Sequence, residues 1–283
     1  MLLSRLCRSR TARGVHKANS RSLSSMIVKS PLSMPELDGV QEPTPKFVMK
    51  SFTDASQISL DALVDGHTGV TRTYGELYNH TYSLAHRLRQ ELGLKKGDVV
   101  AIMSPNNINY FSCFNGIALT GAASTTINPL YGVEEVSYQL DLTKAKAIIA
   151  HPLCLPVAHK ASNGKIPIIN IDSSIQTEES SSMLIDDLLT EPLANIDVDS
   201  YLHSSSYDEE DLVTIPFSSG TTGRAKGVML THRNLTSNIK QIIPLVSPLL
   251  LPDQILPTLH SSISTDLSSS SSSSPSIHCT RDA

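Results

Sequence analysis

The middle of the chain combines two patterns of apolar residues. Thr73 and Glu76 have the spacing of a helix capping box, and leucines then recur at helical intervals until Gly93, so the sequence predicts a helix between these positions. A short unbroken apolar run follows at 99–103, and such a run is typical of a strand buried on both faces of a parallel sheet.

Helices and strands continue to alternate toward the C-terminal half. Further helices are predicted at 108–119 and at a segment with Val133, Val136 and Leu140 on one side, and further strands at 123–127, 147–150, 166–171 and 212–217. Because strands alternate with helices, we expect crossover connections and an α/β fold of layered sheets with flanking helices. The Ser-, Asp- and Glu-rich residues 172–210 are expected to run over the surface, with one short helix near 183–189.

The two ends of the chain differ from its middle. Residues 1–25 carry five Arg, one Lys and no acid, and this Arg- and Ser-rich composition predicts a mitochondrial transit peptide. The alternative is a basic tail that carries no targeting signal, on a cytoplasmic protein. Eleven of the sixteen residues at 261–276 are Ser, so 244–283 is predicted to be a disordered tail. Between these two end segments, a folded domain is predicted at residues 26–243.

Charge and cysteine usage exclude several classes of protein. The 23 Lys and Arg against 27 Asp and Glu give a net charge of −4, which is not a cationic surface for nucleic acid. The four cysteines lie far apart, which argues against a disulfide scaffold or a zinc ribbon and favours a reducing compartment. Prolines interrupt the apolar run at 242–256, so no transmembrane segment is predicted. No grouping of residues has metal-ligand spacing, and no metal ligand is assigned.

The clearest chemistry lies in the decapeptide SSGTTGRAKG at 218–227, between predicted strands at 212–217 and 228–230. Glycine admits positive φ, so successive backbone N–H groups can turn toward one anion, and Ser and Thr hydroxyls add donors. Lys226 adds a mobile positive charge. The segment is not a Walker A loop, because Ala225 stands where that pattern needs Gly. The sequence predicts a polyphosphate site; the alternative is a polar connection that binds nothing. Thr231 is the expected N-cap of the next helix.

The stretch PFSSGTTGRAKGVMLTHRNL resembles the phosphate loop of the adenylate-forming (AMP-binding) superfamily, which includes acyl-CoA synthetases and 4-coumarate–CoA ligases. The resemblance covers about residues 45–240. Segments upstream that resemble the same family are 73–77, 103–107, 117–122 and 127–131. The last of these, with Asn128, Pro129, Leu130 and Tyr131, is similar to the aryl- and acyl-CoA ligase branch.

The resemblance implies an ATP-dependent acid–thiol ligase of fatty acid or phenylpropanoid metabolism. In such enzymes a carboxylic acid attacks the α-phosphate of Mg²⁺-bound ATP to give an acyl-adenylate, and coenzyme A then displaces AMP. By similarity, the residues that would hold the ATP phosphates are Ser218, Ser219, Gly220, Thr221, Thr222, Gly223 and Lys226. The family usually has Pro where this chain has Ala225, so the loop is expected to be slightly less preorganised.

Several parts of the family pattern are not found in 241–283. The aromatic/His segment, the adenine and ribose motifs and the catalytic lysine are missing there, and His232 and Lys240 lie too close to the loop to replace them. His232 is expected to have a polar role at a helix start.

We therefore predict an N-terminal fragment without ligase activity on its own, and we assign no catalytic residue. The alternatives are a nucleotide-binding or homologue-pairing module, and a non-catalytic interaction protein or a product with no stable fold. Incompletely covered strands at 98–103 and 212–217 predict self-association through exposed sheet edges.

Overall fold

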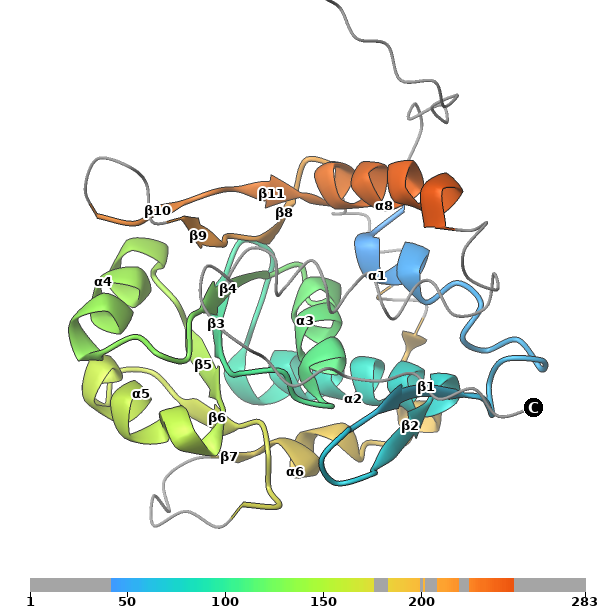
Figure 1. Cartoon of the computed structure of the whole chain (residues 1–283), viewed down its shortest axis with the longest axis horizontal. Coiled ribbons are helices and arrows are strands. Elements are labelled where there is room, and N and C mark those ends of the chain that lie inside the picture. Colours follow the sequence, from blue (N-terminus) through green and yellow to red (C-terminus); the bar gives the residue numbers. More distant parts are fainter. Residues whose placement is uncertain (1–41, 176–182, 199–200, 202–207, 219–223, 247–283) are drawn as a thin grey trace, which may run out of the picture. The chain divides into compact units, whose positions relative to one another are not determined.

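The computed structural model describes residues 42–175, 183–198, 201, 208–218 and 224–246 (Figure 1). The chain divides into two units, 1–35 and 36–283, and all described residues belong to the second. The α-helices are α1 (Thr44–Val48), α2 (Tyr74–Leu92), α3 (Tyr110–Leu119), α4 (Val133–Thr143), α5 (Leu155–Ser162), α6 (Ile185–Leu189) and α8 (His232–Val246). Among these residues, no helix is both long and apolar enough to cross a membrane.

Seven strands form one sheet in the order β11-β8-β4-β3-β5-β6-β7. They are β3 (Val99–Met103), β4 (Ala123–Ile127), β5 (Ala147–Ala150), β6 (Ile168–Asn170), β7 (Met183–Leu184), β8 (Leu212–Thr214) and β11 (Leu230–Thr231). Neighbouring strands are parallel except for β11 and β8, which are antiparallel. Two antiparallel pairs lie outside this sheet: β1 (Asp61–Val64) with β2 (Thr71–Thr73), and β9 (Phe217–Ser218) with β10 (Lys226–Gly227).

The central strand β3 is buried along its whole length because helices cover both faces of the sheet. Val100 and Ile102 pack in one apolar cluster with residues of α2 and α3, whereas Ala101 and Met103 pack in another with residues of α4 and α5 (Figure 1). Successive strand residues point to opposite faces, so a continuous apolar run is what a sheet covered on both sides requires. The predicted α/β class and the strand at 99–103 are confirmed.

Local signals located several elements correctly. Thr73 and Glu76 form the predicted capping box of α2, with the Glu76 N–H donating to Thr73 Oγ1 at 3.2 Å and the Thr73 N–H donating to Glu76 Oε2 at 2.7 Å. Gly93 ends the helix with a φ of 60°, a left-handed conformation that glycine adopts without strain. The predicted strands at 123–127 and 147–150 are confirmed.

Three expectations were wrong. Residues 172–210 do not all run over the surface, because β7 joins the sheet and the apolar face of α6 (Ile185, Leu188, Leu189) is buried in the core. The uncovered face expected at 98–103 is absent, since every residue of β3 is buried. The strand predicted at 212–217 is divided into β8 and β9, which pair with different partners. In addition, α8 reaches Val246 and so extends past the predicted boundary at 243; residues 247–283 lie outside the described part.

Candidate functional site

The two arms of the predicted phosphate loop form a short antiparallel hairpin. Ser218 on β9 lies opposite Lys226 on β10, and both side chains are exposed. The structure therefore places these two predicted residues across from each other, where the loop leaves and rejoins the hairpin. The other five predicted residues, Ser219, Gly220, Thr221, Thr222 and Gly223, lie outside the described residues.

The hairpin lies beyond the carboxyl end of β8. Strands β8 and β4 are parallel and pair through Ser124 and Thr214, and β9 begins three residues after β8 ends. Ligands of open parallel sheets bind outside the carboxyl ends of the strands. The position of the hairpin is thus the one at which an α/β sheet of this kind presents a ligand site.

Hydrogen bonds attach the first arm to the sheet and to α4. The Ile215 N–H donates to the Ser124 carbonyl, and Thr125 Oγ1 donates to the Ile215 carbonyl, both at 2.8 Å. Gln139 of α4 is 1% exposed and donates through Nε2 to Thr125 Oγ1 at 2.8 Å and to the Thr126 carbonyl at 2.9 Å. These hydrogen bonds together restrict the position of the arm.

The second arm contacts both the first arm and α4. The Val228 N–H donates to the Pro216 carbonyl at 2.8 Å. On the α4 side, the Tyr138 hydroxyl donates to the Ala225 carbonyl at 3.4 Å, and the Arg224 guanidinium carbon lies 5.2 Å from the centre of the Tyr138 ring. The strand predicted at 228–230 was wrong: Val228 and Met229 are exposed and connect β10 to β11.

Gly227 allows the arms to approach closely. A Cβ atom at this position would lie 2.9 Å from Ile215 Cγ2 and 3.1 Å from Phe217 Cε2, which is closer than packed carbon atoms approach. We predict that Gly227→Ala separates the arms, because overpacking forces neighbouring groups apart. Hydrogen exchange at the Val228 amide should rise about tenfold. Gly132→Ala is the control, since a Cβ there meets only the end of the exposed Glu135 side chain. Equal exchange in both variants would contradict this account.

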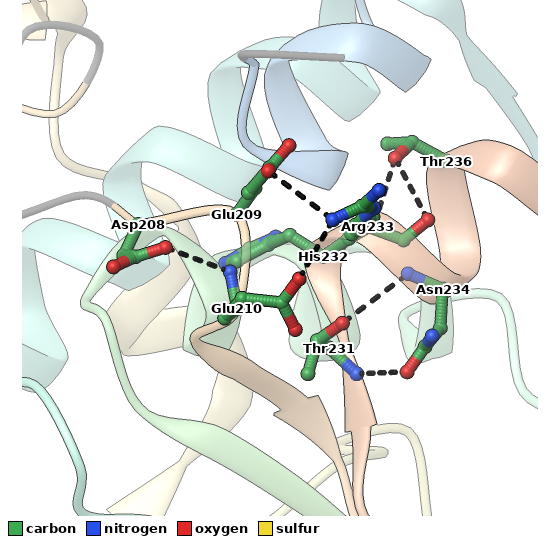
Figure 2. A network of polar contacts seen from close by, with 8 residues as sticks. All are labelled: Asp208, Glu209, Glu210, Thr231, His232, Arg233, Asn234 and Thr236. Carbon is green, nitrogen blue, oxygen red and sulfur yellow. Dashed lines mark hydrogen bonds and ion pairs between the residues drawn. The ribbon is translucent and has the colours of Figure 1, made fainter. Parts of the chain in front are cut away.

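The hairpin continues through β11 into α8, whose N-terminus is capped as predicted. The Asn234 N–H donates to Thr231 Oγ1 at 3.3 Å, and the Thr231 N–H donates to Asn234 Oδ1 at 3.0 Å (Figure 2). Arg233 lies between the carboxylates of Glu209 and Glu210, at 3.5 and 3.2 Å, and Figure 2 shows these acids on the segment that precedes β8. These exposed ion pairs contribute little stability singly, but together with the cap they fix where α8 begins.

His232 begins α8, as the sequence predicted, but its burial was not foreseen. The side chain is 3% exposed, and Nδ1 accepts a hydrogen bond from the Thr44 N–H at 3.0 Å, which joins α8 to the start of α1. Burial lowers the pKa of His232 to about 4, an effect that the nearby Asp211 carboxylate opposes and Lys96 reinforces. The neutral imidazole is the form that can accept this bond. Thr44 lies 188 residues away in sequence, so no local pattern could reveal the contact.

The mostly parallel sheet with helices on both faces defines an α/β domain, and the hairpin lies beyond the carboxyl end of one of its strands. The family model of AMP-binding enzymes matches residues 54–266, and the chain belongs to that family. The predicted membership is confirmed. The match extends beyond residue 240, where the recognised resemblance ended, and into the segment interpreted as a tail.

Relatives in other organisms agree with this assignment. 4-Coumarate–CoA ligase 1 of Oryza sativa subsp. japonica is 34% identical over 184 residues, which are 63% of this chain and 31% of that protein. 4-Coumarate–CoA ligase 2 of Petroselinum crispum is 36% identical over 180 residues, again 63% of this chain and 31% of the relative. The chain thus spans about a third of the length of these relatives.

Two solved structures share the fold. A benzoate CoA ligase from Burkholderia xenovorans LB400 superposes with a TM-score of 0.58 at 19% identity, covering 74% of this chain and 38% of that one. The luciferase-like enzyme of the mealworm Zophobas morio gives a TM-score of 0.62 at 20% identity, covering 74% of this chain and 47% of the other.

Proposed function

We propose that the chain supplies the ATP-phosphate-binding part of an AMP-forming acid–thiol ligase. In this reaction a carboxylate displaces pyrophosphate from ATP, and coenzyme A then takes up the acyl group and releases AMP. The observation that carries the proposal is the hairpin in which exposed Ser218 and Lys226 face each other at the carboxyl end of the sheet. Membership of the AMP-binding family supports it.

The charge of the segment fits a polyphosphate. From Leu212 to Val246 the sequence holds four Lys or Arg side chains, two of them at Arg224 and Lys226, and no Asp or Glu. A β,γ-phosphate group would therefore meet positive charge on the hairpin and no carboxylate of the same segment. The loop residues 219–223 would supply backbone and hydroxyl donors, with Thr221 and Thr222 as the principal ones. Mg²⁺ would arrive with ATP, whose charge it partly neutralises.

The acid substrate is proposed only as a class. The relatives named above are 4-coumarate–CoA ligases and a benzoate CoA ligase is among the structural neighbours, which supports an aryl or acyl carboxylic acid. Mitochondrial import also stays a prediction, supported by the composition of residues 1–25. Self-association stays a prediction as well.

We propose further that these 283 residues bind nucleotide without adenylating an acid. Removing one well-placed electrostatic group typically lowers a rate about 10²–10³-fold, and the segments expected to stabilise the transition state are not recognised in 241–283. A binding module is the second candidate. Binding of Mg·ATP favours the module and its absence favours an inert fragment. Neither should show acid-dependent pyrophosphate exchange, so exchange above that of Thr222→Ala would refute both.

The test of phosphate binding is a calorimetric titration of the full chain with Mg·ATP. We expect saturable binding that Thr222→Ala weakens about tenfold, because one donor to a charged group is lost. AMP, which lacks the β- and γ-phosphates, should bind far more weakly. Thr53→Ala, at an exposed position remote in sequence from the loop, is the matched control. Absence of binding, or equal affinity in the two Thr variants, would contradict the proposal.

A further inference from the structure

Consecutive residues of α4 hold the two arms of the hairpin. Gln139 reaches the first arm through Thr125, as described above, and Tyr138 reaches the second arm directly. The Tyr138 hydroxyl donates to the carbonyl of Ala225, the residue immediately before Lys226. The Arg224 guanidinium lies over the Tyr138 ring at a distance typical of a cation–π contact.

The second arm needs such a restraint near Lys226. Arg224, Lys226 and Gly227 are exposed, and β10 pairs with β9 over only two residues. Ala225 leaves the backbone φ free to vary, unlike a proline. A lysine on a freely moving arm would lose conformational entropy when it binds an anion, which weakens binding. Two contacts from Tyr138 to neighbouring residues reduce that loss before the ligand arrives.

We propose that Tyr138 is a positioning residue for Lys226. It fixes the arm so that the Lys226 ammonium group lies ready for the phosphate chain of the nucleotide. The inference rests on the proposed function and extends it to α4, a helix that supplies no residue of the predicted loop. In this arrangement α4 aligns the arms with each other: Gln139 acts on the side of Ser218 and Tyr138 on the side of Lys226.

The experiment is a double-mutant cycle with the full chain and Mg·tripolyphosphate as the titrant. Tyr138→Phe keeps the ring and removes the hydroxyl, so we expect affinity to fall about threefold, and about tenfold in Tyr138→Leu, which also removes the cation–π contact. In the Lys226→Ala background, Tyr138→Phe should cause no further loss, because its effect passes through Lys226. Tyr131→Phe, at a half-buried tyrosine just before α4, is the matched control.

A second measurement tests the geometry without any ligand. Hydrogen exchange at the Gly227 and Val228 amides should be faster in Tyr138→Phe than in the wild-type chain and unchanged in Tyr131→Phe. Additive effects of Tyr138→Phe and Lys226→Ala on affinity, or unchanged exchange on the second arm, would overturn the inference. If the wild-type chain does not bind tripolyphosphate while exchange responds as expected, the proposed function fails and the restraint by Tyr138 stands as a structural contact only.

Discussion

Lowering the pH from about 7.5 to about 5 is expected to reduce the free energy of unfolding by about 2 kcal/mol through His232 alone. Burial holds the pKa of this imidazole at about 4 in the folded chain, below its ordinary value of 6.5. Between these values the unfolded chain binds the proton and the folded chain does not, so acid favours unfolding. The contribution is complete above pH 6.5, declines as the pH falls below it, and levels off below about pH 4.

Urea unfolding across this pH range measures the effect. His232→Gln removes the titrating group and retains an acceptor for the Thr44 N–H. Over the same pH range, the free energy of unfolding of this variant should therefore fall by about 2 kcal/mol less than that of the wild-type chain. His67→Gln is the control, because His67 is exposed. If the wild-type chain and His232→Gln lose stability in parallel on acidification, His232 is not held neutral by burial.

Reversing the charge of Lys226 is expected to have the largest effect on ligand binding. Lys226→Glu should weaken Mg·ATP binding about 100-fold, because an attractive charge-assisted contact becomes a repulsive one on a segment that holds no other acid. Lys226→Ala should weaken it about tenfold. Since Lys226 is exposed and lies at the end of a short strand, the midpoint of thermal unfolding should change little in either variant.

The control for Lys226→Glu is the same charge reversal at Lys165, which is exposed in the turn before β6. Calorimetric titration at two salt concentrations separates a local contact from a general field, because a general field is screened by salt. An equal loss of affinity in the two variants would mean that net charge, and not the position of Lys226, governs binding.

The bounds of an element could be predicted from sequence where they depend on residues close together in the chain. They could not be predicted where they depend on contacts with residues far away in the chain. Thr73, Glu76 and Gly93 define both ends of α2 because a cap is a contact between neighbours in sequence. Val228 and Met229 looked like a strand because they are apolar, but the pairing of β11 with β8 begins only at Leu230. The burial of α6 likewise depends on its packing against the rest of the core, which its own short sequence does not contain.

The same division applies to the candidate site. The hypothesis of a phosphate site could be drawn from sequence alone, since glycines, hydroxyls and one lysine within ten residues are a local composition. The contacts that hold the hairpin in place could not be predicted from sequence. Tyr138 contacts Ala225 across 87 residues of sequence, and Gln139 acts through a threonine on a different element. Both belong to a helix whose pattern predicted only an apolar face toward the core.

The most direct test of the central claim is peptide-resolved hydrogen exchange of the full chain with and without Mg·ATP. If the phosphate chain binds between the arms of the hairpin, protection should be concentrated in peptides covering residues 215–230 and absent from the turn at 163–165, which follows α5. Lys226→Glu should abolish that protection. Binding of Mg·ATP with protection elsewhere, and none at 215–230, would contradict the assignment of the hairpin as the phosphate site.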